Sequence, residues 1–394
     1  MAVLTVAIAM TFVGFGFMTP FMPLYLQQVG VTEPEQVRAW SGGIAAAASI
    51  SFAISAPFWG LLADRLGRKP MVIRAMWGSG IALIALSFVR DPALLLTIRV
   101  IQGLFSGPVT ASLALTSTTV PDRHLTRAIG AIQAAMLIGG SLGPMIGGVA
   151  ADAVGIPSTI LVGGVLNICA GFLVLAFCRE QFVRPHPSGP VRRHRIREGI
   201  AILSPALFAL AAMQIALQFS SNGVIAVFAL YVQELGRDVS ASTFTGLIQG
   251  LYSAAAIVGV LLAARVSTSF GYKAPLVAGA LVAAILFMPQ ALAPNLLILG
   301  LSRGVQGIFV GLLSPLISTL VSVVTPVERR ATVYGAISGS SGLGAAAGPL
   351  SAGFVSAWLG LASVFWMTAG VLIVAALIAT RVRGFSRATS FEKS

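Results

Sequence analysis

Long apolar runs alternate with short polar breaks along almost the whole chain. The runs are about 18–25 residues long, which is the length of a helix that crosses a hydrocarbon core of about 30 Å. We count about twelve runs of this length, among them residues 2–26, 40–62, 71–89, 92–113, 127–151, 158–177, 206–232 and 243–265. The pattern predicts an all-α integral membrane protein.

Composition and the placement of charge extend this prediction. Of the 394 residues, 57% are hydrophobic and 9% are charged, which is too little polar surface to cover a soluble protein of this size. Lys and Arg gather in alternate breaks, around residues 65–74, 123–127, 179–197, 265–273, 329–330 and 381–393, whereas the other breaks hold Arg38, Arg90 and Arg237. The positive-inside rule then predicts a multi-pass protein of the cell inner (plasma) membrane with both termini in the cytoplasm. Since topology accounts for the net charge of +13, we expect no nucleic-acid partner.

Residues suited to metal, disulfide or enzyme chemistry are sparse. Cys169 and Cys178 stand nine residues apart in one predicted helix and fall on opposite faces, so neither a disulfide nor a metal site is expected. The sequence has no Gly-x-x-x-x-Gly-Lys-Ser/Thr loop for a nucleotide. No predicted span holds a cluster of His, Cys or carboxylates. We therefore expect neither an enzyme nor a bound cofactor.

A charged corner joins the apolar runs 40–62 and 71–89. It contains Gly60, Asp64, Arg65, Gly67, Arg68, Lys69 and Pro70. Gly67 permits a positive φ and Pro70 suits the first turn of a helix, so a tight helix–loop–helix turn is predicted. The run matches every position of Gly-x-x-x-Asp-Arg-x-Gly-Arg-Lys and resembles the loop between helices 2 and 3 of the major facilitator superfamily. The resemblance implies a conformational switch in which Asp64 pairs with Arg68, with Asp122 and with the N-terminus of helix 11. The alternative is that the cations only anchor the topology.

Polar residues line one face of the otherwise apolar run 92–113. Arg99, Gln102, Ser106 and Thr110 are spaced three and four apart, and a buried arginine in a membrane costs at least about 2.5 kcal/mol. Arg99 should therefore face a cavity or a partner. Arg99-Val-Ile-Gln102-Gly103 resembles the Arg-x-x-Gln-Gly signature of helix 4 in the same family. The alternative is an arginine that backbone carbonyls hold in a structural role.

Glycines four residues apart mark the run 127–151 as a place of close helix approach. The residues are Gly139, Gly143, Pro144, Gly147 and Gly148, and Pro144 removes one helical hydrogen bond. The spacing resembles the antiporter signature of helix 5. Within the superfamily this signature is associated with exporters rather than importers. We interpret it as a hinge, and a Leu at Gly143 or Gly147 is expected to hold the two halves of the protein apart. Small residues at this spacing also occur in inert bundles.

The second half of the chain repeats the first. Leu24-Tyr25 returns as Leu230-Tyr231, Arg99 and Gln102 return as Arg303 and Gln306, and Gly143-Pro144 returns as Gly348-Pro349, at offsets of 206, 204 and 205. A nearly constant offset predicts two parallel six-helix halves with a cavity between them. The predicted domains are residues 1–178, a basic linker at 179–205, residues 206–381 and a tail at 382–394. Asp64 corresponds to Thr268, so the second corner lacks the carboxylate.

The predicted cavity combines polar and aromatic residues from both halves. The candidate substrate residues are Phe12, Phe15, Arg99, Gln102, Gln214, Gln218, Asn222, Gln249, Tyr252, Arg303 and Gln306. The alternative for the aromatic residues is that they pack against other helices or lipid and do not contact substrate. Since two arginines and no carboxylate are expected within the spans, we expect neutral or anionic amphiphiles as substrates.

Over its whole length the chain resembles the twelve-helix drug:proton antiporter branch of the major facilitator superfamily. The resemblance implies a monomeric carrier in the lipid bilayer that exports small amphiphilic, drug-like molecules by alternating access, in exchange for protons. The chain departs from those drug antiporters that keep a carboxylate in helix 1, so we expect proton coupling either to be relocated to Asp64 and Asp122 or to be absent. The alternatives are a metabolite or sugar facilitator or symporter of the same fold, a channel, or a membrane receptor that transports nothing.

Overall fold

The computed structural model describes residues 2–178, 180, 204–237, 239–325 and 329–381. All regular structure in this part of the chain is helical, and twelve segments there are long and apolar enough to cross a membrane. The prediction of an all-α membrane protein is thus confirmed. The predicted linker and tail, residues 179–205 and 382–394, lie mostly outside the described residues, and the domain boundaries stay a prediction.

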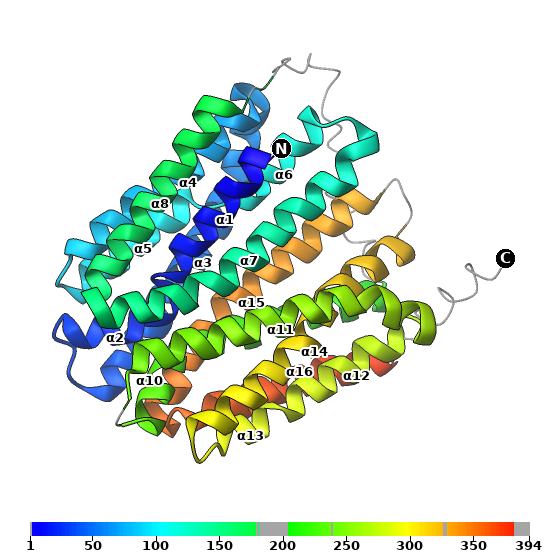
Figure 1. Ribbon diagram of the computed structural model, residues 1–394. Coiled ribbons are helices and arrows are strands. Elements are labelled where there is room, and N and C mark those ends of the chain that lie inside the picture. The colour runs from blue at the N-terminus through cyan, green and yellow to red at the C-terminus, as the bar shows by residue number, and fades with distance from the viewer. Residues whose placement is uncertain (1, 179, 181–203, 238, 326–328, 382–394) are drawn as a thin grey trace.

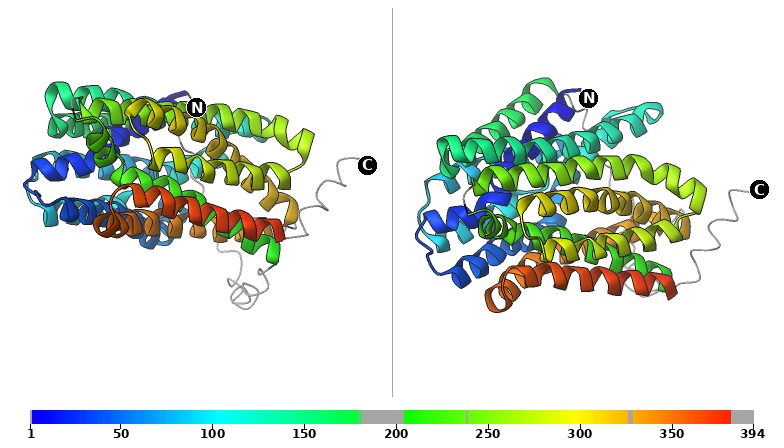
Figure 2. Two further views of the ribbon diagram at one scale, coloured as in Figure 1. Left: turned by 90° about the horizontal axis from the view of Figure 1, so that it is seen from below. Right: turned by 60° about the horizontal axis from the view of Figure 1, so that its bottom comes forward.

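The helices form two groups along the chain, which run side by side in Figures 1 and 2. The first bundle comprises α1 (Ala2–Gly16), η1 (Thr19–Phe21), α2 (Met22–Gln28), α3 (Pro34–Leu66), α4 (Arg68–Phe88), α5 (Pro92–Phe105), α6 (Pro108–Thr119), α7 (Asp122–Val154) and α8 (Ile156–Phe177). The second bundle comprises α10 (Pro205–Leu235), α11 (Ala241–Phe270), α12 (Lys273–Ile285), α13 (Phe287–Ala291), α14 (Leu296–Val324), α15 (Arg330–Leu359) and α16 (Ala362–Arg381). The main contacts between the bundles join α3 to α15 and α7 to α11.

The repeated sequence corresponds to repeated contacts. The Tyr25 hydroxyl donates to the carbonyls of Leu86 and Val89 at the end of α4, at 2.9 and 2.7 Å. The Tyr231 hydroxyl likewise donates to the carbonyls of Gln290 and Ala291 at the end of α13, at 2.8 and 3.1 Å. Each tyrosine therefore satisfies carbonyl groups that the end of a helix leaves without an intrahelical partner.

One predicted span is broken next to the centre of the molecule. The run 92–113 divides into α5 and α6 at Gly107, whose φ of 106° favours glycine. Side chains of neighbouring helices bind the freed carbonyls: Trp59 Nε1 donates to Leu104 O at 2.6 Å and Arg74 Nη2 to Ser106 O at 3.2 Å. The Arg74 guanidinium also lies 3.8 Å from the centre of the Trp59 ring. By contrast, α7 runs without a break through Pro144.

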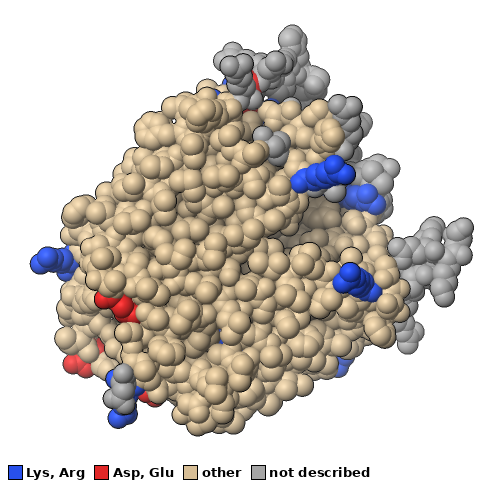
Figure 3. Space-filling model, in the orientation of Figure 1, with Lys and Arg blue, Asp and Glu red and all other residues tan. Residues whose placement is uncertain are grey.

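The two ends of the bundle differ in charge and in packing. We call one the closed end. Residues of the two bundles hydrogen-bond to one another there, Gln27 to Gln233 and Arg38 to Ser356. The opposite end is the basic end, where α3, α11 and α16 finish near Arg65, Arg265 and Arg381. Figure 3 shows Lys and Arg side chains beside a hollow in this part of the surface, with a broad uncharged band between the two ends.

Candidate functional site

Two adjoining cavities lie between the bundles. The larger has a volume of about 360 Å³ and the smaller about 250 Å³. Ser49 and Phe52 of α3 line both, so the cavities meet at these two side chains. The described residues that line them include no Asp or Glu. A ligand that spans both cavities would contact each bundle.

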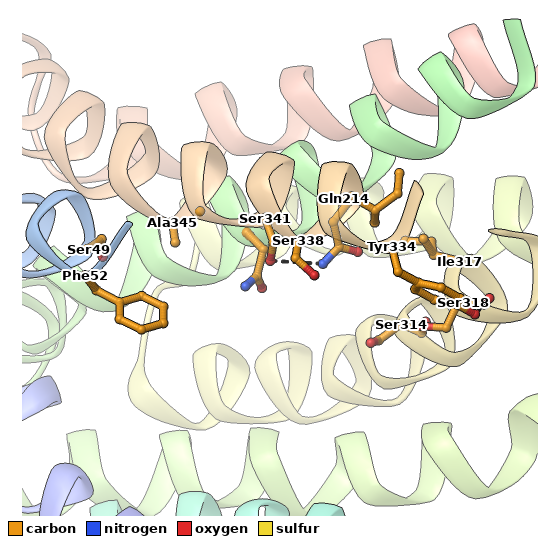
Figure 4. A pocket seen from close by; sticks show the side chains of 13 residues that line it. Ser49, Phe52, Gln214, Ser314, Ile317, Ser318, Tyr334, Ser338, Ser341 and Ala345 are labelled. Atoms are coloured by element: carbon orange, nitrogen blue, oxygen red, sulfur yellow. Dashed lines mark hydrogen bonds between the residues drawn. The ribbon is translucent and has the colours of Figure 1, made fainter. Parts of the chain in front are cut away.

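The large cavity is formed mainly by small polar side chains of the second bundle (Figure 4). Gln214 Nε2 on α10 donates to Ser341 Oγ on α15 at 3.2 Å, and the Tyr334 hydroxyl donates to Ser318 O on α14 at 2.8 Å. The rest of its lining is Ser49, Phe52, Gln218, Ser314, Ile317, Ile337, Ser338, Gly342 and Ala345. Such a lining offers neutral hydrogen-bonding groups without fixed charge.

Arg99 of α5 lies at the small cavity. Its side chain is 9% exposed, and its Nη1 donates to Gln102 Oε1 at 2.7 Å and contacts Met18 Sδ at 3.8 Å. Its Nε has no hydrogen-bond partner in the described part of the chain. The remaining lining is Phe15, Thr19, Ala45, Ala48, Ser49, Phe52, Gly103, Ser106, Asn222, Ile225 and Pro349. Arg99 is thus the one charged side chain among the described lining residues.

Other predicted substrate residues lie away from both cavities. Phe12 packs its ring edge-on against Phe15, with 6.1 Å between the centroids. Arg303 is 1% exposed, and its Nη1 donates to Gln306 Oε1 at 3.1 Å. Gln249, Tyr252 and Gln306 are also buried, and neither cavity is lined by them. Of the predicted set, the structure therefore brings Phe15, Arg99, Gln102, Gln214, Gln218 and Asn222 to the cavities.

Sequence reasoning missed the serine face of α15 and two residues of α3. Tyr334, Ser338, Ser341 and Ala345 follow one another at intervals of four, three and four residues, which places them on one helical face. This spacing was readable as a small, polar stripe. Nothing comparable singles out Ser49 or Phe52, because α3 holds similar residues on several faces.

Hydrogen bonds join the two bundles at the closed end. Gln27 Nε2 donates to Gln233 Oε1 at 3.1 Å, and the two residues occupy matching positions of the repeat. Arg38 Nη1 donates to Ser356 O at 3.0 Å. The amide N–H and the hydroxyl of Thr243 donate to Asp152 Oδ2.

Glycines bring the bundles together just inside these bonds. A Cβ at Gly42 of α3 would meet the carbonyl of Pro349, and a Cβ at Gly246 of α11 would meet that of Pro144. Gly148 likewise approaches α11, at Ser242. We call these two crossings, α3 on α15 and α7 on α11, the glycine seams.

The sequence predicted that a Leu at Gly143 or Gly147 would hold the two halves apart. The contacts of these two glycines correct that prediction. A Cβ at Gly143 would meet Val13, and one at Gly147 would meet Phe17, so both glycines pack against the N-terminal span of their own bundle. Gly139 faces the same span, and Gly348 faces Phe219 of α10. A residue four positions along a helix stays on nearly the same face, whereas Gly148 is turned by about 100° from Gly147 toward α11.

The charged corner contains a carboxylate that the sequence did not indicate. Gly67 has the predicted positive φ, 97°. Glu180 accepts hydrogen bonds from the N–H groups of Arg68 and Lys69, at 2.8 Å each, at the start of α4. Lys69 Nζ donates to Leu175 O at 2.7 Å, as Lys273 Nζ does to Thr380 O at 2.8 Å in the second bundle. The side chains of the predicted switch residues Asp64 and Asp122 lie outside the described residues.

Comparisons with known proteins agree with this architecture. The family model described as Major Facilitator Superfamily matches residues 4–244 and 210–390. Multidrug resistance protein MdtG of Escherichia coli is 31% identical over 369 residues, which cover 92% of this chain and 89% of MdtG. A bacterial homolog of the human lysosomal transporter Spinster, solved in an inward-facing and occupied conformation, superposes with a TM-score of 0.80 at 16% identity, covering 96% of this chain and 95% of that one. The human organic anion transporter MFSD10 superposes with a TM-score of 0.70 at 18% identity, covering 96% and 98%.

Proposed function

Because this chain belongs to the Major Facilitator Superfamily and is a multi-pass membrane transporter, we propose that it exports small amphiphilic molecules by alternating access, in exchange for protons. The two bundles would rock about the central cavities. Substrate would enter from the cytoplasm at the basic end and leave at the closed end. The Escherichia coli relative is named a multidrug resistance protein, which supports a drug-like substrate.

One observation carries the proposal: both cavities lie between the bundles, and in the described part of the chain the glycine seams and the hydrogen bonds of Gln27 and Arg38 join the bundles at the closed end. This is the arrangement expected of a carrier caught with one side open. The positive-inside rule assigns the basic end to the cytoplasm. The conformation is then the inward-facing one.

The lining of the cavities supports an amphiphilic substrate. Phe15 and Phe52 provide aromatic surface, and serine and glutamine side chains provide neutral hydrogen-bonding groups. Such pockets accept molecules with an apolar body and few polar groups. For proton exchange we keep Asp64 and Asp122 as the proposed relay, since the described cavity lining holds no carboxylate.

Flux measurements test the transport reaction. Everted membrane vesicles that contain the protein are energised with a pH gradient and supplied with a panel of amphiphiles. We expect uptake that saturates with concentration and falls when an uncoupler collapses the gradient. Saturable uptake of a sugar or metabolite without any amphiphile would establish the alternative facilitator. Absence of saturable flux for all compounds would overturn the proposal.

A crosslink tests the alternating-access mechanism. In a background with Cys169→Ser and Cys178→Ser, the pair Gln27→Cys and Gln233→Cys places one thiol on each of the two residues whose side-chain amides hydrogen-bond across the closed end. Oxidation should stop transport, and a reductant should restore it. The matched control is Gln27→Cys alone, which should be insensitive to the oxidant. Full transport by the crosslinked protein would contradict movement at the closed end.

A further inference from the structure

We propose that Arg99 forms an anion-binding subsite of the small cavity. The small side chain of Ala48 leaves this subsite open to the cavity. The substrates then include amphiphiles with a single organic anionic group such as a carboxylate. The inference deepens the proposed function and rests on it. It assigns different roles to the two arginines of the repeat: Arg99 meets substrate, and Arg303 is structural.

The two arginines occupy equivalent places. Arg99 and Arg303 each donate Nη1 to the glutamine three residues further on, Gln102 and Gln306. The next glycine on each helix, Gly103 or Gly307, fixes the neighbour across the interface. A Cβ at Gly103 would meet the carbonyl of Ala48, and one at Gly307 would meet that of Tyr252. Ala48 of α3 and Tyr252 of α11 are therefore structural counterparts, as their separation of 204 residues also indicates.

Aromatic rings cover Arg303. Its guanidinium carbon lies 4.3 Å from the centre of the Tyr252 ring and 5.3 Å from that of Phe228. Cation–π contact of this kind stabilises a guanidinium that is removed from water. Neither cavity is lined by Arg303. Since Arg303 is 1% exposed and lies against two aromatic rings, we assign it a structural role.

At Arg99 the covering ring is replaced by a methyl group. Ala48 itself lines the small cavity next to Arg99, as does Ala45 one turn earlier, where α11 carries Gln249. Arg99 is nevertheless more than nine-tenths buried, although it lines the small cavity. Gln102 holds the guanidinium from one side. The result is an oriented, buried cation with one direction left open toward the cavity.

Charge in the cavity selects for an anion. No Asp or Glu occurs among the described lining residues of either cavity, so a ligand anion would meet attraction without a competing carboxylate. Apolar walls screen this attraction weakly. Phe15 and Phe52 lie on the same cavity and can pack against the apolar body of the ligand. Beyond Phe52 the large cavity offers room for a longer molecule.

Three fluorescent probes with one ring system test the subsite. Dansylglycine is anionic, dansylamide is neutral and dansylcholine is a permanent cation. Their dissociation constants are measured by fluorescence titration on the purified full chain in detergent. We expect dansylglycine to bind about tenfold or more tightly than dansylamide, because a carboxylate gains charge-assisted hydrogen bonds from a guanidinium. A preference for dansylcholine in the wild type would overturn the proposal.

Four variants separate charge from space. Arg99→Gln should bring the two dissociation constants within about twofold of each other, and Arg99→Lys should keep most of the anion preference. Ala48→Tyr should cover Arg99 and abolish the preference, whereas Ala48→Ser should keep it. Thermal unfolding of each variant identifies any that fail to fold. Arg99→Lys keeps the charge and Ala48→Ser keeps the small side chain, so a loss of the anion preference in either of these folded variants would also contradict the proposal. An anion preference that survives Arg99→Gln would refute the subsite.

Binding and flux are scored separately. Anion-selective binding without saturable flux would support the subsite and contradict the proposed transport function. Saturable flux of neutral or cationic amphiphiles without anion-selective binding would contradict the subsite and leave the transport function standing.

Discussion

Gly42→Ala should weaken the closed end of the carrier, and the neighbouring glycine supplies its control. At Gly42 an added Cβ would lie 2.7 Å from the Cα of Gly353 on α15, and it would also meet the carbonyl of Pro349. At Gly43 an added Cβ would have no atom within 4 Å. The two substitutions are chemically identical and adjacent on α3, and they differ in whether the new methyl group enters the seam.

The magnitude follows from this geometry. Ordinary van der Waals contact begins at 3.4 Å, so α3 and α15 must separate by at least the difference between 3.4 and 2.7 Å, roughly 0.7 Å, to admit the methyl group, because the Pro349 carbonyl lies closer still than the Cα of Gly353. Overpacking of this kind costs about 1–3 kcal/mol. The cost applies only to the conformation in which the seam is closed. The ratio of this conformation to the one open at the closed end should fall about 5- to 150-fold.

Thiol accessibility measures the shift. Ser49→Cys in the background with Cys169→Ser and Cys178→Ser places one thiol between the two cavities. A membrane-impermeant maleimide is added to right-side-out and to inside-out vesicles. Gly42→Ala should raise labelling from the closed end and lower it from the basic end. Gly43→Ala should leave both rates unchanged, and equal labelling of the two glycine variants would refute the seam as the contact that closes this end.

Two further predictions concern the charged corner. Asp64→Asn should abolish transport while the protein still inserts into the membrane, because the resemblance assigns its charge to conformational switching; normal turnover of a well-expressed variant would contradict this role. Glu180→Gln should lower stability by about 1–2 kcal/mol, because a full negative charge no longer binds two N–H groups at the start of α4. Thermal unfolding in detergent checks this, with Glu234→Gln on the exposed end of α10 as the control, and an equal effect of both substitutions would exclude the cap at α4.

Much of the fold was determined by the sequence alone. A bilayer requires helices of a narrow length range that satisfy their own backbone hydrogen bonds, so hydrophobic runs translate directly into spans. The repeat in the sequence matched Tyr25 to Tyr231, and in the structure these two residues bind equivalent carbonyl groups. Arg99 and Gln102 were identified because a charge within an apolar run is costly and therefore conspicuous. The break at Gly107 was not predicted, because Trp59 and Arg74 of other helices bind the freed carbonyls.

The tertiary structure decided which face of each helix meets which neighbour. Arg99 and Arg303 have similar sequence surroundings. In the structure Tyr252 covers Arg303, whereas Ala48 leaves Arg99 open to the small cavity. Gly147 and Gly148 are adjacent, yet the first packs within its bundle and the second faces the other. Glu180 reaches Arg68 across more than a hundred residues. The bilayer imposes length and polarity on each span locally, whereas pairing between spans depends on side-chain shapes that meet only after the helices pack together.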